Sequence, residues 1–261
     1  MKLGFLGPKG TFSYEACLEY EKVDELLEYK TIKDTILALK NEEVSEVIVP
    51  IENSIQGGVT ETIDSLIQND NIYIKKELVI KINQNLIANK NYELKDIKEI
   101  YSHPQAIAQC REFIENNLKN VVIHQVSSTA LAAKEIKEKD NCACIANKSC
   151  IEEYKLCLLK ENIQENNSNE TRFWVLSKKQ NKEGKKMSII FSTKNKPGAL
   201  HKVLGIFFEN DINLSKIESR PAKTVLGEYI FLVDIEVNKK TTNTLEKLKD
   251  ECSYLKVLGK Y

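Results

Sequence analysis

The sequence is poor in the features that mark membrane, secreted and nucleic-acid-binding proteins. No apolar run approaches the roughly 18 residues that a membrane-spanning helix needs, and Pro8 interrupts the N-terminal segment before a signal-peptide core can form. Acidic and basic residues balance at 38 each, so the basic surplus of a nucleic-acid-binding protein is missing. These absences predict a cytoplasmic chain whose site takes a small molecule, with neither membrane nor nucleic acid as a partner.

Cysteine, histidine and arginine are also scarce. The seven cysteines are odd in number and contain no Cys-x-x-Cys pair, and three histidines are available as further ligands. We therefore expect reduced, mostly buried thiols and no metal site. Among the 38 basic residues, Arg111, Arg172 and Arg220 are the three arginines. Each is a candidate for a position that needs the planar guanidinium group.

Length and patterning favour two domains. The chain has 261 residues, of which 42% are hydrophobic, and this is enough for a core in each of two domains. Residues 1–180 alternate apolar strands with helical patterns, which is typical of an α/β fold. The strands expected there are 2–6, 46–49, 72–82, 99–101, 121–126, 142–146, 157–160 and 172–176, and the helices are 33–42, 60–69, 104–117, 128–139, 147–154 and one from about residue 13.

A second, smaller domain follows a polar stretch at 178–186 that contains no apolar residue. Residues 186–261 then show the order strand, helix, strand, strand, helix, strand, at 187–192, 199–210, 212–218, 228–237, 243–252 and 254–258. This order predicts an α+β domain of the ferredoxin-like, βαββαβ type.

Polar residues gather where expected strands end and helices begin, which is where open α/β sheets bind ligands. Thr11 and Ser13 start the first helix, where free N–H groups can bind an anion, although the same side chains could simply cap that helix. Ser128 and Thr129 offer hydroxyls at a second helix start. The glycines before Thr11 match neither the dinucleotide nor the Walker pattern, so we expect no nucleotide cofactor.

Two further segments place polar side chains after an expected strand. Glu52, Asn53 and Ser54 follow directly on an apolar run, and a plain turn would account for Asn53 but not for Glu52. Ser102 ends another strand, and His103 comes next, in a position where it is either a helix cap or an acid–base group.

The run Thr171-Arg172-Phe173 belongs to the last strand of the first domain. Alternation along a strand puts Thr171 and Phe173 on one face and Arg172 on the other. The three side chains therefore cannot share one pocket unless the strand bulges, and Thr171 is the better site candidate.

These segments resemble, in order and spacing, the motifs of the prephenate dehydratase family with its C-terminal ACT regulatory domain. Departures are small: Ile51 stands where valine is more usual, and His201 stands where an aliphatic residue is common. The matching motifs are GPKGTFS at 7–13, PIENS at 50–54, SHPQ at 102–105, SSTA at 127–130, TRF at 171–173, PGAL at 197–200 and ESRP at 218–221.

The resemblance implies a two-lobed α/β catalytic domain, like a periplasmic binding protein, over residues 1–180, and an ACT domain over 186–261. It implies conversion of prephenate to phenylpyruvate with loss of carbon dioxide and the ring hydroxyl, without a cofactor. Thr171 is then expected to donate a hydrogen bond to the leaving oxygen, with its proton relayed from water or Glu52. The residues implied in catalysis are Thr171, Glu52, Asn53, Ser102 and Gln109, and those implied in substrate binding are Thr11, Ser13, Ser54, Ser128, Thr129, Arg172 and Phe173.

The resemblance also implies allosteric regulation by phenylalanine, bound between paired ACT domains of a homodimer or homotetramer. Gly198 would let the backbone approach the amino acid, and Glu218 would complement its ammonium group, whereas Arg220 is expected to organise the loop or the neighbouring subunit. A plain dimer interface without ligand is the alternative. The implied effector residues are Gly198, Ala199, Leu200, Asn213, Glu218, Ser219, Arg220 and Pro221.

Two other functions fit the same sequence. One is arogenate dehydratase, which performs the same elimination on the amino acid analogue of prephenate. The other is a sensor that binds ligands without turnover, although the presence of Glu52, Asn53 and Thr171 argues against it.

Overall fold

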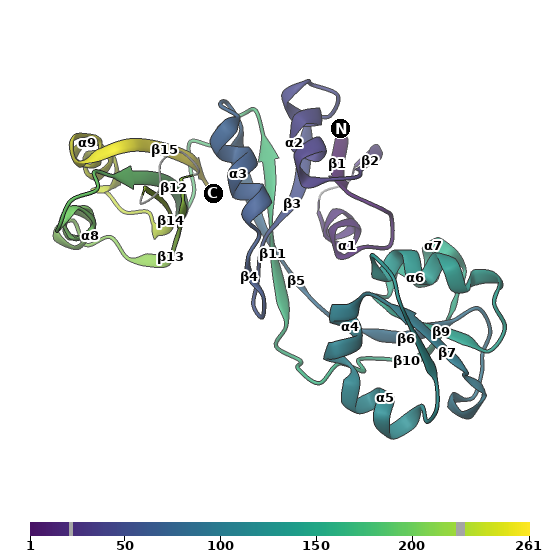
Figure 1. Cartoon of the computed structure of the whole chain (residues 1–261). Helices are drawn as coiled ribbons and strands as arrows, with labels where there is room; N and C mark the ends of the chain where they lie inside the picture. Colours follow the sequence, from purple (N-terminus) through teal and green to yellow (C-terminus); the bar gives the residue numbers. More distant parts are fainter. Residues whose placement is uncertain (21–22, 223–227) are drawn as a thin grey trace. The chain divides into compact units, whose positions relative to one another are not determined.

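The computed structural model describes residues 1–20, 23–222 and 228–261 and contains two compact units (Figure 1). The first unit comprises residues 1–62 and 78–174, and the second comprises residues 63–77 and 175–261. Residues 63–77 and 175–180, which the sequence predicts in the catalytic domain, therefore belong to the same unit as the ACT domain.

The first sheet builds one lobe of the catalytic domain. Its strand order is β2-β1-β3-β11-β5, with the short β4 paired to β3. Leu3 and Phe5 on β1 are fully buried, as expected for a parallel strand covered on both faces. The strands are β1 (Lys2–Leu6), β2 (Glu25–Tyr29), β3 (Glu46–Asn53), β4 (Gly57–Gly58), β5 (Tyr73–Lys81) and β11 (Glu170–Ser177), and the helices that follow them are α1 (Phe12–Glu19), α2 (Ile32–Lys40) and α3 (Thr60–Gln68).

The second sheet builds the other lobe, with the strand order β10-β6-β9-β7-β8. Helices α4 and α5 cover one face of this sheet, and α6 and α7 cover the other (Figure 1). All five residues of β9 are buried between these layers. The elements are β6 (Asn85–Ala88), β7 (Glu99–Ser102), α4 (Pro104–Gln109), α5 (Arg111–Asn117), β8 (Val122–Gln125), α6 (Thr129–Glu135), β9 (Cys142–Ala146), α7 (Ser149–Tyr154), β10 (Cys157–Lys160) and the short 3₁₀ turns at Leu94–Asp96 and Ile136–Glu138.

Two predicted elements of the catalytic domain were wrong in detail. The helix expected at 104–117 is interrupted at Cys110, because the carbonyl oxygen of Gln109 accepts the N–H of Glu165 from a distant loop. The strand expected at 46–49 continues to Asn53, because Glu52 and Asn53 pair with the hairpin strand β4. Strands β2, β4 and β6 were not predicted at all.

The ACT domain has the predicted βαββαβ order. Its strands form an antiparallel sheet in the order β13-β14-β12-β15. Helices α8 and α9 lie on one side of this sheet (Figure 1). Val203, Phe207 and Leu248 on these helices are buried in one core with residues of the strands. The elements are β12 (Lys186–Thr193), α8 (Ala199–Glu209), β13 (Leu214–Pro221), β14 (Tyr229–Glu236), α9 (Thr241–Glu251) and β15 (Cys252–Lys260).

All seven cysteines are free thiols, and five of them are buried. Burial raises the pKa of the Cys17, Cys110 and Cys150 thiols to about 12. Within the described part of the chain, no helix is long and apolar enough to cross a membrane.

A buried carboxyl group on α1 predicts a pH dependence of stability. Burial, with a smaller effect of Glu19, raises the pKa of Glu15 to about 7, while Lys148 opposes the change. Since the folded-state pKa lies above the unfolded one, the stability contributed by protonated Glu15 is lost as pH rises through about 7. We expect Glu15→Gln to raise the melting temperature by on the order of 2 °C at pH 8, and by less at pH 5. Thermal melts at both pH values check this, and equal shifts at both would contradict it.

Candidate functional site

A cavity of about 350 Å³ lies in the first unit, and residues from both lobes line it. Its lining combines hydroxyl, amide and imidazole groups with apolar side chains. The lining residues are Leu6, Thr11, Phe12, Ser13, Pro50, Asn53, Gln56, Val59, Ile82, Gln84, His103, Gln105, Ala106, Ser127, Ser128, Thr129, Thr171 and Phe173. The structure thus brings together seven of the residues that we predicted for catalysis or substrate binding, from four distant segments of the chain.

Thr171 and Asn53 form the polar centre of this cavity. Asn53 lies at the end of β3 and Thr171 near the start of β11, and Asn53 Nδ2 donates a hydrogen bond of 2.9 Å to Thr171 Oγ1. Because Thr171 Oγ1 accepts this bond, its own proton is available to a ligand.

A set of further hydrogen bonds fixes the Asn53 amide. Its Nδ2 also donates to Asn169 Oδ1 at 2.8 Å, and its Oδ1 accepts the N–H groups of Ile55 and Gln56 at 3.0 and 3.1 Å. These contacts orient the amide so that its nitrogen faces Thr171. With 8% of its surface exposed, Asn53 holds this orientation in a nearly dry environment.

The two residues at the start of α1 differ in what they can do. Thr11 caps the helix: its Oγ1 accepts from Tyr14 N, and it donates to the carbonyl oxygen of Pro8 at 2.9 Å. Its hydroxyl is therefore already used inside the loop. Ser13 is 6% exposed and lines the cavity.

Gly10 allows this loop to approach the second lobe. Its φ is +85°, and an added Cβ would lie 3.0 Å from both Cys150 Sγ and Tyr154 Cε2. Tyr154 Oη also donates to the carbonyl oxygen of Lys9 at 2.8 Å. These contacts set the position of α1 at the cavity.

The second lobe contributes the other hydroxyls. Ser128 Oγ accepts Leu131 N at 3.0 Å as the N-cap of α6, and its own proton can still be donated. Ser127 and Thr129 flank it along the cavity wall. His103 also lines the cavity, and its Nδ1 accepts Gln105 N at 3.3 Å as the cap of α4.

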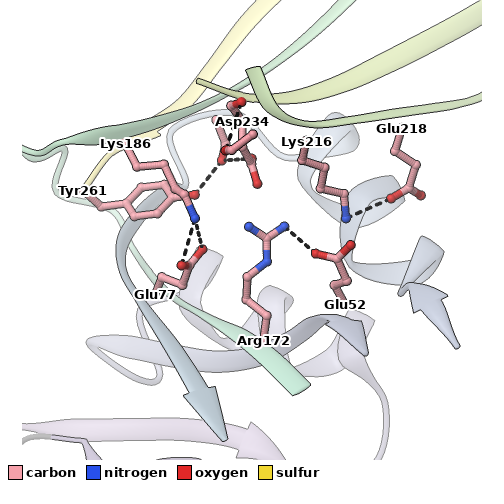
Figure 2. Close-up of polar contacts among 10 residues, drawn as sticks. Glu52, Glu77, Arg172, Lys186, Lys216, Glu218, Asp234 and Tyr261 are labelled. Carbon is pink, nitrogen blue, oxygen red and sulfur yellow. Dashed lines mark hydrogen bonds and ion pairs between the residues drawn. The ribbon is translucent and has the colours of Figure 1, made fainter. Parts of the chain in front are cut away.

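Glu52 and Arg172 lie outside the cavity lining. Glu52 directly precedes Asn53 on β3, and Arg172 directly follows Thr171 on β11. Their side chains therefore point to the opposite face of the sheet. Arg172 Nη2 contacts Glu52 Oε2 at 2.9 Å (Figure 2). The Arg172 guanidinium also lies 5.8 Å from the Trp174 ring centroid.

Three other predicted residues also lie apart from this cavity. Ser102 is fully buried and donates to the carbonyl oxygen of Ile145 at 2.7 Å, so it joins β7 to β9. Ser54 is exposed and bonds the 168–170 loop. Gln109 lines a neighbouring cavity of about 310 Å³, together with Gln56 and Gln105.

Three glutamines that line the cavity were not among the predicted site residues, namely Gln56, Gln84 and Gln105, the last of which belongs to the SHPQ motif. Gln56 follows the PIENS motif at a distance of two residues, so its position in a site loop was a usable signal. Gln84 lies in the crossover between β5 and β6, and nothing in its local sequence marks it.

The second unit has a smaller cavity of about 300 Å³ beside the start of α8. Gly198, with φ +78°, Ala199 and Leu200 line it together with His201 and Tyr229. These are the first three of the predicted effector residues.

The remaining predicted effector residues have other partners. Asn213 Nδ2 donates to Glu236 Oε1 at 2.9 Å, and Glu218 Oε2 contacts Lys216 Nζ at 3.1 Å (Figure 2). Arg220 Nη2 contacts Asp64 Oδ1 at 2.6 Å, and 7% of the Arg220 side chain is exposed. Ser219 and Pro221 flank Arg220 on β13.

Comparison with known proteins accounts for both parts of the chain. A profile of the prephenate dehydratase family matches residues 3–181, and a profile of the ACT domain matches residues 187–253. The prephenate dehydratase of Methanocaldococcus jannaschii is 41% identical over 97% of this chain and 95% of its own length. The prephenate dehydratase of Lactococcus lactis subsp. cremoris is 37% identical over 100% of this chain and 97% of its own length.

Solved structures show the same similarity. The crystal structure of prephenate dehydratase from Arthrobacter aurescens in complex with L-Phe has a TM-score of 0.90 at 30% identity, over 99% of this chain and 89% of that one. The enzyme from Staphylococcus aureus subsp. aureus Mu50 has a TM-score of 0.86 at 32% identity, over 99% of both chains. The fold, the order of the motifs and these full-length matches place the chain in the prephenate dehydratase family of lyases, with an ACT domain after the catalytic domain.

Proposed function

We propose that the cavity of the first unit carries out the family's reaction with Thr171 as the hydrogen-bond donor to the leaving oxygen. The single observation that supports this role is the bond from Asn53 Nδ2 to Thr171 Oγ1, which directs the threonine proton away from Asn53. In the reaction the bond from the ring to the carboxylate breaks and its electron pair completes the aromatic ring. The bond to the ring hydroxyl breaks at the same time, and that oxygen takes one proton and leaves as water.

Neutral donors hold the two carboxylates in this proposal. Ser13, Ser127, Ser128 and Thr129 present hydroxyls to the cavity from the two lobes, and the start of α1 adds free N–H groups. A closure of the lobes on the substrate would bring the two sets together. Hydrogen bonds of this kind are strong when they are made to a carboxylate.

The apolar part of the lining assists loss of carbon dioxide. Phe173 is 1% exposed and lies two residues from Thr171 on the same strand face, with Ile82, Val59 and Phe12 elsewhere in the lining. A carboxylate held against apolar groups loses its hydration, which raises its free energy. Carbon dioxide is uncharged and does not need that hydration, so its release is favoured.

We assign Glu52 and Arg172 a supporting role in place of the direct roles that the resemblance implied. Their ion pair bridges β3 and β11 on the face opposite Asn53 and Thr171. The pair therefore holds in register the two strands that carry the catalytic side chains. A threonine hydroxyl is too weak an acid to act alone, and water in the cavity is the proton source in this proposal.

Replacing Asn53 by aspartate tests the orientation of Thr171. The variant keeps the shape of the side chain but presents an acceptor where Nδ2 donates, so the threonine proton turns toward the carboxylate. We expect kcat to fall by on the order of 10²-fold with a small change in KM. Steady-state kinetics with prephenate measures both, and Asn69→Asp, which alters an amide outside the cavity, is the control. A normal kcat in folded Asn53→Asp would contradict the role.

One assay separates the functions that the sequence leaves open. The purified chain is incubated with prephenate or with arogenate, and the appearance of phenylpyruvate or phenylalanine is followed. Turnover of prephenate is the expected result. Turnover of arogenate alone would identify an arogenate dehydratase, and turnover of neither would leave a ligand-binding sensor.

We further propose that phenylalanine regulates the enzyme through the ACT domain. The cavity beside α8 places Gly198 and the N–H groups of the α8 start around a space of amino acid size. A second ACT domain, in a homodimer or homotetramer, would bring Asn213 and Glu218 to the same ligand.

We also infer a cytoplasmic location, because seven free thiols suit a reducing compartment.

A further inference from the structure

Gln84 lines the catalytic cavity and carries a buried hydrogen-bond acceptor. Its side chain lines the cavity and 3% of the residue is exposed. Its Nε2 donates to Gln109 Oε1 at 3.3 Å, while its Oε1 has no hydrogen-bond partner among the described residues. A buried acceptor without a donor is costly and therefore rare in folded proteins. A ligand that supplies the donor would remove this cost.

The surrounding contacts hold this acceptor in place. Gln164 Oε1 accepts the backbone N–H of Gln84 at 2.8 Å, so the crossover between the lobes is fixed at this residue. Two residues earlier, Ile82 N donates to the carbonyl oxygen of Asn169 at 2.8 Å, and Asn169 Oδ1 accepts from Asn53 Nδ2. The Asn53 amide also bonds Thr171. One continuous hydrogen-bonded path thus connects the Gln84 segment to the proposed catalytic threonine.

The substrate has one group that matches this acceptor. Prephenate carries two ionised carboxylates and a ketone, which only accept hydrogen bonds, and one ring hydroxyl, which donates. We propose that Gln84 Oε1 accepts the hydrogen bond from the ring hydroxyl and so orients the leaving oxygen toward Thr171. This assignment rests on the proposed function of Thr171.

In this proposal Gln84 is a positioning residue, which takes no part in the bond changes. The leaving oxygen keeps its own proton, which stays hydrogen-bonded to Gln84 Oε1, and receives a second proton from the side of Thr171. It departs as water when the carbon–oxygen bond breaks. Gln84 itself neither gains nor loses a proton. Contacts from both Gln84 and Thr171 align the hydroxyl oxygen to accept the second proton before the carbon–oxygen bond breaks.

Inhibitor binding tests the contact without relying on turnover. The probes are a ring-saturated prephenate, which cannot aromatise, and its counterpart that lacks the ring hydroxyl. We expect the wild-type chain to bind the hydroxyl-bearing probe about tenfold more tightly, which corresponds to one good hydrogen bond. In Gln84→Met this preference should fall close to one. An unchanged preference in Gln84→Met would overturn the proposal.

Two further variants separate the contact from a purely structural role. Gln84→Glu keeps an acceptor at this position, so a clear preference for the hydroxyl-bearing probe should remain, and its loss would also overturn the proposal. Asn117→Met, which alters an exposed amide on α5 outside the cavity lining, is the control and should keep the wild-type preference. If Thr171→Val retained full turnover, the proposed catalytic role would fail, while the probe preference would still decide the role of Gln84.

Discussion

Thr171→Val is expected to lower kcat by a factor on the order of 10² or more while substrate still binds. Valine keeps the shape of threonine and removes the hydroxyl that Asn53 Nδ2 orients at 2.9 Å. The leaving oxygen then has no donor at the moment when negative charge develops on it. Binding should persist, because in the proposed site other groups, among them Ser13 and Ser128, hold the carboxylates.

Steady-state kinetics and titration of a non-reactive analogue measure the two effects of Thr171→Val separately. Thr171→Ser is the matched control, because it restores the donor and should retain more activity than valine. The pattern expected is a fall in kcat with KM nearly constant. Near-normal turnover in folded Thr171→Val would refute the donor role.

The face that each residue of the site occupies was only partly predictable. Alternation correctly separated Thr171 and Phe173 from Arg172, because the strand around them was expected. The same rule would have separated Glu52 from Asn53. The sequence predicts that this strand ends at residue 49, before Glu52 and Asn53, so alternation along it does not reach them. The extension of β3 to Asn53 depends on pairing with β4, which no local pattern reveals.

Residues whose role comes from long-range contacts were missed. Gln84 meets Gln109 and Gln164, which are 25 and 80 positions away, so its local sequence carries no signal of the site. The break between α4 and α5 has the same origin, since it depends on a bond from Glu165. The hydrophobic pattern and the turn residues predict helices and strands. Only the folded structure shows which side-chain and backbone amides form hydrogen bonds with each other.

Strand β2 was missed for a different reason. Its sequence, Glu25 to Tyr29, has only two leucines in succession and lies at the edge of the sheet, where its residues are only partly buried. An edge strand needs few apolar side chains, so its pattern resembles that of a loop. By contrast the βαββαβ order of the ACT domain was predictable, because two of its strands, β12 and β14, carry longer apolar runs.

The ion pair between Arg220 and Asp64 links the effector motif to the helix that follows a site loop. Asp64 lies on α3, which begins directly after Val59, a cavity-lining residue. Thr62 on the same helix donates to the carbonyl oxygen of Pro50, another lining residue, at 2.6 Å. Arg220 contacts Asp64 at 2.6 Å and does not line the cavity beside α8. It is therefore placed to connect effector binding with the position of α3.

Arg220→Met is accordingly expected to weaken inhibition by phenylalanine about tenfold while kcat changes by less than about threefold, because a coupling of this size is typical between two sites. Steady-state kinetics at a series of phenylalanine concentrations measures both the inhibition constant and kcat. Asp64→Asn should weaken inhibition similarly, and the double variant should add little, because both single changes break the same contact. Lys249→Met, which breaks an exposed ion pair on α9, is the control and should leave inhibition unchanged. An unaltered inhibition constant in folded Arg220→Met would refute the coupling, whereas wild-type enzyme that phenylalanine does not inhibit would refute the regulation itself.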